Sequence, residues 1–323
     1  MIVISEAQAR QLVRIEDAID AVEHAFVAMS RQEARNYPVV REPVGYRDAV
    51  FGVKTGCDRA LPLLGLKAGG YWPHNAGAGA SNHQSAMLLF DPETGRASAL
   101  VSANYLTGVR TGAASAIATR HLARRDASVL GIIGAGVQAH YQLRATLAVR
   151  PIRSVHAWNR SPANLELLAR TARELGLEFV AAGSCRAVAE AADVLVTVTP
   201  SQQPLVAAEW VRPGTHINAM GADTRGKQEL DPRLVAAAVL FVDEAAQAMS
   251  IGECQHAFAA GLVTPASCRA TLGEVAAGLA AGRQADGEIT LFDGTGVALQ
   301  DLVVADLAVR AAATLGLGAT VDY

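Results

Sequence analysis

The fold of this chain is decided by residues Val129–His140, which read VLGIIGAGVQAH. The first half is apolar and predicts a buried β-strand, and the second half predicts the start of a helix. Between them lies the turn Gly134-Ala135-Gly136, which begins a GxGxxA pattern. The first glycine of this pattern permits a tight turn, the second lets the backbone approach a pyrophosphate, and the small third residue lets the helix pack closely on the sheet. The stretch predicts a dinucleotide-binding turn, with the phosphates at the helix N-terminus. The alternative is a small-residue turn in another kind of α/β domain.

Strand and helix patterns alternate around this turn, from Ala127 to Glu244. Strands are predicted at 129–134, 154–159, 177–182, 193–199, 215–220 and 239–244, and helices at 137–149, 161–176, 185–192 and 231–238. This alternation predicts βαβ units, and the near-continuous apolar strands predict a sheet buried on both faces. We therefore predict an α/β fold with a Rossmann-type, doubly wound parallel sheet.

The end of the second predicted strand bears on the choice between NAD(H) and NADP(H). A domain that prefers NAD usually carries Asp or Glu there, which binds the ribose 2′-hydroxyl. This chain reads Asn159-Arg160-Ser161 and has no carboxylate at that place. An arginine is able to pair with a 2′-phosphate, and its two neighbours are able to donate hydrogen bonds to it. We expect NADP(H) to be favoured over NAD(H). The alternative is that Arg160 is a solvated surface charge.

Two further strand ends are expected to border the cofactor. The stretch Val196–Pro200 ends a strand where adenine and ribose usually pass, and Asn218–Asp223 ends another where the nicotinamide would lie. The candidate cofactor-binding residues are Thr111, Gly134, Ala135, Gly136, Val137, Gln138, Asn159, Arg160, Ser161, Thr199, Met220 and Gly221.

A hydride-transfer enzyme also needs residues that hold its substrate, and the part before the glycine-rich turn supplies candidates. Lys67 lies among apolar residues and glycines in GLKAGG, where desolvation would make it lose its proton more readily. The alternative is a surface lysine with a buried stem. Arg110 stands alone among small residues in TGVRTGAAS, which suggests a bidentate carboxylate clamp or a buried structural ion pair. The substrate-binding candidates are Arg41, Lys67, Asn75, His83, Gln84 and Arg110.

Outside the alternating region, helices are predicted at 6–13, 15–32, 106–124 and 297–316. An extended pattern covers 37–53, and a strand, turn and strand cover 85–101 with the turn at Asp91–Gly95. The chain has no tandem repeat and no low-complexity linker.

Composition excludes several classes of protein. A net charge of −3 and a pI near 6.2 do not favour nucleic acid as a partner. The apolar runs are short, so no membrane span is expected, and the N-terminus lacks the pattern of a signal peptide. The four cysteines are scattered without a CxxC pair, which fits a reducing cytoplasm and predicts no metal site. GxSxG and GxxxxGK[ST] are absent, so two common classes of enzyme are not indicated.

Seven motifs together resemble those of the ornithine cyclodeaminase/mu-crystallin family. They keep the order and spacing of that family and cover roughly Pro38 to Leu315. The motifs are GLKAGGYWPHN, SAMLLFDPETG, LTGVRTGAASAIATRHLAR, GIIGAGVQAHYQL, VHAWNRS, HINAMGADTRGKQELD and FDGTGVALQD. Two departures occur near the family's substrate site: Arg225 replaces a frequent proline, and AGAGASNHQS lacks a frequent Leu-Pro.

The resemblance implies a split architecture. A second, α+β domain for substrate binding and dimerisation would comprise residues 1–118 with 299–323, and the Rossmann domain would comprise 119–298. A homodimer is implied. The positions that match family ligands of the substrate carboxylate are Arg41, Lys67 and Arg110, and Lys67 and Asp223 match the acid–base residues.

Family members include cyclodeaminases, alanine dehydrogenases and reductases of cyclic ketimines. Because the acidic strand end is missing, the resemblance favours NADPH-dependent reduction of Δ1-pyrroline-2-carboxylate or Δ1-piperideine-2-carboxylate to proline or pipecolate. The alternatives are an ornithine or lysine cyclodeaminase, an alanine dehydrogenase, and a non-catalytic ligand-binding protein like mu-crystallin.

Overall fold

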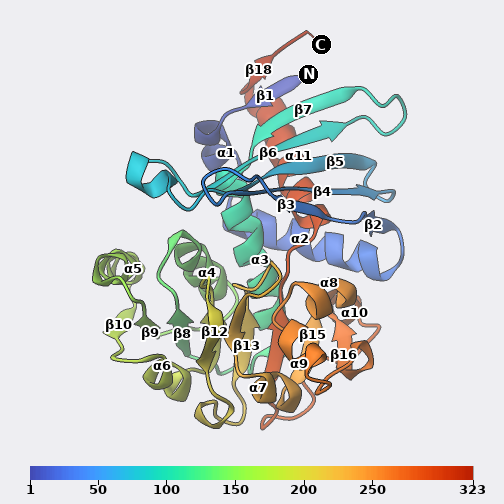
Figure 1. The fold of residues 1–323 in the computed structure, drawn as a ribbon. Helices are drawn as coiled ribbons and strands as arrows, with labels where there is room; N and C mark the ends of the chain where they lie inside the picture. The colour runs from blue at the N-terminus through green and yellow to red at the C-terminus, as the bar shows by residue number, and fades with distance from the viewer. Residues whose placement is uncertain (323) are drawn as a thin grey trace. The chain divides into compact units, whose positions relative to one another are not determined.

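The computed structural model describes residues 1–322, apart from the side chain of Ala76, and shows two compact units (Figure 1). The first comprises Met1–Arg110 with Val297–Tyr323, and the second comprises Thr111–Gly296. The boundaries that the family resemblance implies, 118/119 and 298/299, fall inside α3 (Asn104–Leu122) and in the first turn of α11 (Ala298–Leu315). Since α3 is one continuous helix that starts in the first unit and ends in the second, no proline or other helix-breaking signal marks the point of division.

The second unit is built on an eight-stranded sheet in which every neighbouring pair is parallel. In spatial order its strands are β10 (Glu178–Ala181), β9 (Ser154–Trp158), β8 (Val129–Ile133), β11 (Val194–Thr197), β13 (His216–Ala219), β17 (Thr290–Asp293), β15 (Val239–Val242) and β16 (Cys268–Thr271). From β8 the chain continues to β9 on one side and returns to β11 on the other. The strand order therefore reverses between β8 and β11, which is where open α/β sheets bind ligands. The predicted Rossmann-type sheet is confirmed.

Both faces of this sheet are buried, as the apolar strands predict. Ile133 belongs to one apolar core with Leu195, while Ile132 belongs to a second core with Val155. Neighbouring residues of β8 therefore face opposite cores, because successive side chains of a strand alternate between its faces. The helices between the first strands are α4 (Val137–Leu147), α5 (Pro162–Glu174), α6 (Cys185–Ala191) and α7 (Pro232–Ala237).

The first unit holds a second, mostly antiparallel sheet. Its spatial order is β18 (Ala319–Thr320), β1 (Ile2–Ile4), β7 (Ala97–Ser102), β6 (His83–Phe90), β5 (Leu63–Tyr71), β4 (Val50–Asp58) and β2 (Ala34–Asn36), with β3 (Val40–Pro43) also paired to β4. Only β1 and β7 pair in parallel. The closing helix α11 packs on β4 and β5 and on α2 (Ile15–Ser30). The C-terminal segment therefore completes the N-terminal unit.

Burial alternates along the central strands of this sheet. On β4 and β5 the residues on one side, including Lys54, Asp58, Leu63 and Lys67, are buried. On the opposite side the apolar residues of β4, β5 and β6 are only half-buried, and Phe51 is exposed. Helix α11 covers the buried side, and the other side is an open apolar face within this chain.

The remaining elements are short. They are α1 (Glu6–Leu12), β12 (Gln202–Val206), β14 (Gln228–Leu230), α8 (Ala245–Ser250), α9 (Gln255–Ala259), α10 (Leu272–Ala276) and the 3₁₀ turns at Asn75–Ala78, Ala208–Trp210 and Pro265–Ser267. The parallel pair of β12 and β14 was not predicted. Within residues 1–322, no helix combines the length and hydrophobicity needed to cross a membrane.

Candidate active site

The glycine-rich turn has the geometry that its sequence predicts. Gly134 has φ of 102°, and a Cβ there would lie 2.8 Å from the side chain of Thr199, so only glycine fits. Gly136 is the N-cap of α4, and a Cβ on it would meet nothing within 4 Å. The backbone of Gly136 therefore faces open space at a helix N-terminus, where a phosphate is favoured.

Two amide side chains beside this turn test its fit to a dinucleotide. Asn159 accepts a hydrogen bond from the backbone N–H of Ala135 at 3.1 Å and donates to the carbonyl of Ser161 at 3.0 Å. The side chain of Asn159 therefore stabilises the conformation of the glycine-rich turn. The buried Oε1 of Gln138, in the first turn of α4, has no hydrogen-bond partner within residues 1–322. Buried polar atoms are rarely left unpaired, and an amide oxygen only accepts, so this atom fits a ligand group that donates a hydrogen bond, such as a ribose hydroxyl.

The other end of the predicted cofactor site is held by a residue that the sequence did not reveal. The buried carboxylate of Glu229 accepts the N–H of Thr199 at 2.6 Å and the N–H of Gly221 at 3.0 Å. It therefore ties the loop after β11 to the loop after β13. Burial raises the pKa of Glu229, and these hydrogen bonds act in the opposite direction. Met220, the first residue of the loop after β13, is buried.

Asp223, predicted as an acid–base residue, follows β13 and is partly exposed. Its Oδ1 lies 2.6 Å from Nζ of Lys227, in an i,i+4 ion pair. Lys227 also donates to the carbonyl of Gly221 at 3.3 Å. Asp223 is therefore held by a lysine of its own loop.

In the first unit, two predicted carboxylate ligands converge on an unpredicted aspartate. Asp301, in the first turn of α11, lies with Oδ1 2.8 Å from Nζ of Lys67 and 2.9 Å from Nε of Arg110. Arg110 also donates from Nη1 to Oε1 of Gln300 at 2.9 Å. Asp301 has 0% exposure, and Lys67 and Arg110 have 7% and 8%. The buried ion pair considered as an alternative for Arg110 is present.

Burial and charge set the protonation of this cluster. Burial lowers the pKa of Lys67 to about 7, because it outweighs the attraction of Asp301, and the charges of Arg110 and Lys54 add to the lowering. Burial acts to raise the pKa of Asp301, but the charges of Arg110, Lys67 and Lys54 outweigh it and lower that pKa. The result is a buried carboxylate beside a lysine that exchanges its proton near neutral pH.

Three polar atoms of this cluster remain unsatisfied within residues 1–322. They are Nε of Arg110, Oδ2 of Asp301 and Nε2 of Gln300. Arg110 Nε is close enough to Asp301 for an ion pair but lacks the alignment of a hydrogen bond. Three such atoms in one buried cluster indicate that a polar ligand completes it, because buried polar groups are otherwise almost always paired. Within residues 1–322, no group of three His, Cys, Asp or Glu side chains has the arrangement of a metal site.

Of the remaining substrate-binding candidates, Arg41 and His83 lie on strands and Asn75 lies in a 3₁₀ turn. Arg41, half-buried on β3, pairs in register with Gly52 of β4. His83 begins β6 opposite Tyr71. Asn75 donates to the carbonyl of Ser81 at 3.1 Å.

Gln84 uses both ends of its amide within the first unit. It donates to the carbonyl of Ser81 at 2.9 Å and accepts from Nδ2 of Asn104 at 2.9 Å. The register of β5 and β6 also places Gln84 on the opposite face from Met87, the partner of Lys67. We therefore assign Gln84 to holding the start of α3.

The cofactor candidates not yet placed lie at the starts of helices or on them. Ser161 is the N-cap of α5 and accepts from the N–H of Asn164 at 3.5 Å. Arg160 is exposed, and no hydrogen bond or ion pair within residues 1–322 engages it. Val137 is 71% exposed at the start of α4, and Thr111 is buried on α3.

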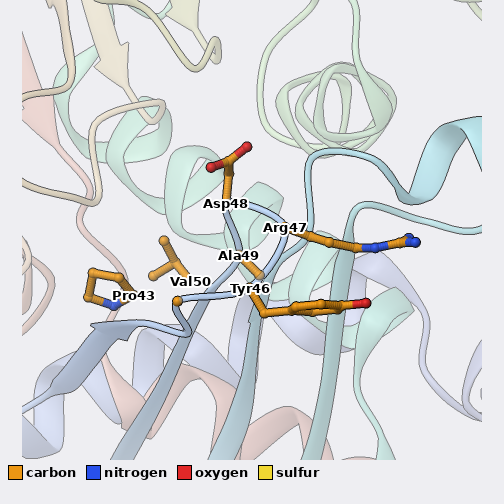
Figure 2. Close-up of a pocket in the computed structure, with 7 residues that line it drawn as sticks. Pro43, Tyr46, Arg47, Asp48, Ala49 and Val50 are labelled. Atoms are coloured by element: carbon orange, nitrogen blue, oxygen red, sulfur yellow. The ribbon is translucent and has the colours of Figure 1, made fainter.

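A separate pocket of about 300 Å³ lies at the turn between β3 and β4, and Figure 2 shows the side chains that line it. Its lining consists of Pro43, Gly45, Tyr46, Arg47, Asp48, Ala49 and Val50. All of these belong to one turn, and none belongs to the Asp301 cluster. The pocket is therefore a feature of the turn.

Asp301, Glu229 and Lys54 are site residues that were not predicted from the sequence. Asp301 and Glu229 lie in motifs that carry the family resemblance, FDGTGVALQD and HINAMGADTRGKQELD. The available signal was an acidic residue inside an apolar helix or strand pattern, which points to a buried partner.

Comparison with known proteins agrees with this architecture. The profile of the ornithine cyclodeaminase/mu-crystallin family matches residues 1–314. The iminosuccinate reductase of Paracoccus denitrificans is 51% identical over 322 residues, covering 100% of both chains. Its crystal structure in complex with NAD+ superposes with a TM-score of 0.95 at 50% identity, covering 100% of this chain and 99% of that one.

Two other structures match along almost the whole chain. The Δ1-pyrroline-2-carboxylate reductase of Thermococcus litoralis, in complex with NADH and L-proline, has a TM-score of 0.96 at 32% identity, covering 99% of this chain and 100% of that one. An archaeal alanine dehydrogenase dimer with bound NAD has a TM-score of 0.95 at 36% identity, covering 100% and 99%. The chain belongs to the ornithine cyclodeaminase/mu-crystallin family.

Proposed function

We propose that this protein reduces the imine of a small dicarboxylic acid, iminosuccinate, to L-aspartate with a nicotinamide cofactor. The chain is an oxidoreductase that acts on carbon–nitrogen bonds, as its full-length relatives are. The observation that carries the choice of substrate is the set of buried cations Lys54, Lys67 and Arg110 acting on the single carboxylate of Asp301. A dianionic substrate offers this cluster of basic side chains two carboxylates, which buried basic side chains bind through charge-assisted hydrogen bonds.

The residues of the first unit have distinct roles in this proposal. Arg110, through its planar guanidinium, binds the carboxylate next to the imine carbon, and Arg41 assists it. Asp301 orients Arg110 and Lys67 through ion pairs of 2.9 and 2.8 Å. Bound nicotinamide supplies the hydride that the imine carbon receives.

Lys67 is the proton donor in this proposal. With a pKa of about 7 it is partly protonated at neutral pH and is able to give a proton to the imine nitrogen. Asp223 is held by Lys227 at 2.6 Å, so we assign Asp223 to positioning its loop beside the nicotinamide. This assignment moves the main acid–base role, which the resemblance implied for both residues, to Lys67.

The second unit holds the cofactor, and we propose NADPH ahead of NADH. The support is the missing carboxylate at the end of β9 together with the exposed, unengaged Arg160 at the N-terminus of α5. The backbone at Gly136 and the helix start of α4 would hold the pyrophosphate, and Oε1 of Gln138 would accept a hydrogen bond from a hydroxyl of the cofactor. The relatives described above were solved with NAD+ or NADH. The preference is therefore tested by comparing the affinity and turnover with NADPH to those with NADH.

A second candidate is the reduction of a cyclic ketimine, Δ1-pyrroline-2-carboxylate or Δ1-piperideine-2-carboxylate. It is favoured by the full-length similarity to a Δ1-pyrroline-2-carboxylate reductase. The same Arg110, Lys67 and Asp301 would serve its single carboxylate and its imine nitrogen.

The test is a turnover assay on the purified protein. Iminosuccinate forms in solution when oxaloacetate condenses with ammonia and loses water, and its reduction consumes one NADPH and one proton to give L-aspartate. We expect ammonium-dependent NADPH oxidation with oxaloacetate, faster than with either cyclic ketimine. Faster reduction of a cyclic ketimine would reverse the order of the two candidates. Release of ammonia from ornithine without net cofactor reduction would identify a cyclodeaminase instead.

A further inference from the structure

We propose that Lys54 binds the second carboxylate of the substrate and so selects dicarboxylic imines over monocarboxylic ones. This inference rests on the proposed function, because it names the residue that recognises the part of iminosuccinate which alanine-type and proline-type substrates lack. Lys54 lies on β4 and is 9% exposed.

The strand register places Lys54 beside the proposed proton donor. Lys54 and Lys67 are directly opposite partners in the antiparallel pair of β4 and β5. Opposite partners point to the same face of a sheet, with Cβ atoms about 4.5–5.5 Å apart. The two ammonium groups are thus carried by adjacent positions on the face that α11 covers. When the imine nitrogen of a substrate lies at Lys67, the next basic side chain on that face of the sheet is Lys54.

The residues around the two lysines are the smallest possible. Positions two residues apart along a strand share a face. On β4 and β5 the positions flanking both lysines on this face are glycines: Gly52, Gly56, Gly65 and Gly69. No Cβ from these positions competes with the two lysines for the space next to them. Side chains of neighbouring elements use part of this space: a Cβ at Gly65 would lie 2.9 Å from Leu302 of α11, and one at Gly52 would lie 3.4 Å from Cβ of Arg41. The glycines therefore let α11 and Arg41 approach the strands closely on the face that carries the two lysines.

Arg41 extends the same face. It pairs in register with Gly52, which in turn pairs with Gly69. The face thus presents Arg41, Lys54 and Lys67 from three neighbouring strands. Lys54 lies on the strand between those of Arg41 and Lys67. A substrate whose first carboxylate is held by Arg110 beside Lys67 therefore has Lys54 as the next basic group for its second carboxylate.

Lysine is rare in this chain, so its presence at position 54 supports a specific role for that residue. Of 28 basic residues only three are lysines, and the remainder are arginines. Lys67 is the buried proton donor, Lys227 pairs with Asp223, and Lys54 is the third. Arginine therefore supplies most of the positive charge of the chain, and two of its three lysines face each other across β4 and β5. A compact ammonium fits opposite Lys67 where a planar guanidinium would need more room.

Lys54 also influences its neighbours by charge. Its charge acts to lower the pKa of Lys67 and of Asp301. A residue that acted only in this way would affect every substrate equally. Selectivity between dicarboxylates and monocarboxylates is the property that separates direct binding from this indirect effect.

The experiment compares the wild type with Lys54→Met, which keeps the length and loses the charge, and with Lys54→Arg, which keeps the charge. Oxidation of L-aspartate and of L-alanine gives kcat and KM for a dicarboxylate and a monocarboxylate. For Lys54→Met we expect kcat/KM with L-aspartate to fall about 10- to 100-fold, mainly through KM, which is the fold-change of one lost charge-assisted hydrogen bond. The value with L-alanine should stay within about threefold, and Lys54→Arg should keep more of the activity with L-aspartate than Lys54→Met does.

Because Lys54→Met also removes a charge that lowers the pKa of Lys67, kcat/KM is compared on the plateau of each pH profile. Equal losses there with both amino acids would overturn the proposal and leave Lys54 as a residue that only tunes Lys67. Measuring the affinity of substrate analogues distinguishes a failure of the role of Lys54 from a failure of the proposed function. Oxaloacetate and pyruvate are the keto analogues of the two imines, and their affinities follow from thermal-shift titration in the presence of cofactor. If the wild type oxidises neither amino acid, the proposed function is wrong. Loss of affinity for oxaloacetate alone in Lys54→Met would still support the role of Lys54, and unchanged affinity for both would refute it.

Discussion

At the scale of the residue, the chemistry of this protein depends on how burial and charge are balanced around Asp301. An isolated lysine keeps its proton at neutral pH. Burial lowers the pKa of Lys67 to about 7, while Asp301 keeps it from falling further. The same aspartate holds Arg110, so one carboxylate positions both the proton donor and the carboxylate clamp.

The pH dependence of the reaction should therefore report Lys67. The lysine gives its proton in reduction and must accept one in oxidation. Below about pH 7 it is protonated, so we expect the rate of imine reduction to fall as the pH rises above 7 and the rate of amino acid oxidation to rise through the same range. Lys67→Met should lower turnover about 10²- to 10⁴-fold in both directions and remove this dependence.

The measurement is kcat/KM against pH in both directions, with the melting temperature as a check on folding. Asp301 raises the pKa of Lys67, so Asp301→Asn should move the inflection to lower pH. An unchanged inflection in Lys67→Met would assign it to another group.

Cofactor choice should depend on Arg160. This residue is exposed and follows a strand end without a carboxylate. Arg160→Ala should weaken NADPH binding about 10- to 100-fold, the effect of losing one charge-assisted phosphate contact, and leave NADH binding nearly unchanged. Fluorescence titration of both cofactors measures this, and Arg170→Ala, on the exposed surface of α5, is the matched control. Equal weakening for both cofactors, or a wild type that prefers NADH, would contradict the proposed preference.

At the scale of the element, the turn between β3 and β4 carries conformational strain. Arg47 and Asp48 have φ of 52° and 51°, in the left-handed region that glycine and asparagine adopt most readily. Two successive residues with positive φ are typical of a type I′ hairpin turn, which prefers Asn-Gly. The turn is closed by a hydrogen bond from the N–H of Ala49 to the carbonyl of Tyr46 at 3.1 Å.

Relieving this strain should stabilise the protein. The double substitution Arg47→Asn and Asp48→Gly should raise the free energy of unfolding by about 1–2 kcal/mol, because left-handed backbone costs about that much in ordinary residues. The exposed His74–Asp48 contact at 3.5 Å contributes little that would be lost. Chemical denaturation measures the change, with Arg47→Asn alone as the intermediate. A lower stability would show that the native side chains compensate for the strain.

At the scale of the whole molecule, the open apolar face of the first unit predicts a homodimer. The side of β4, β5 and β6 away from α11 carries half-buried apolar residues, and it includes Phe51 at 43% exposure. Contiguous apolar surface of this kind usually marks an interface. The resemblance to the family also implies a dimer.

A charge in the middle of this face should break the assembly. Leu66→Arg, on β5, should shift the protein from dimer to monomer at micromolar concentration, as measured by light scattering. The matched control is Leu279→Arg, which changes a leucine that is 65% exposed in the second unit and should leave the dimer intact. A monomeric wild type would refute the prediction directly.

Much of the molecule was determined by the sequence itself. GxGxxA after an apolar strand predicted the tight turn at Gly134, because positive φ and the contact with Thr199 allow only glycine there. The alternation of apolar strands and amphipathic helices predicted the parallel sheet, since each strand that is buried on both faces must be apolar throughout. These features depend on neighbours in the chain, so local patterns reveal them.

The partners of the predicted site residues were decided only by the tertiary structure. Asp301 is 234 residues from Lys67 in the chain, and its contact exists because α11 returns to cover β4 and β5. Lys54 and Lys67 become neighbours through the register of two antiparallel strands, which a shift of one residue would abolish. A sequence fixes which charges a chain has, but the pKa of Lys67 depends on which charges the fold brings within a few ångströms and on how far it removes them from water.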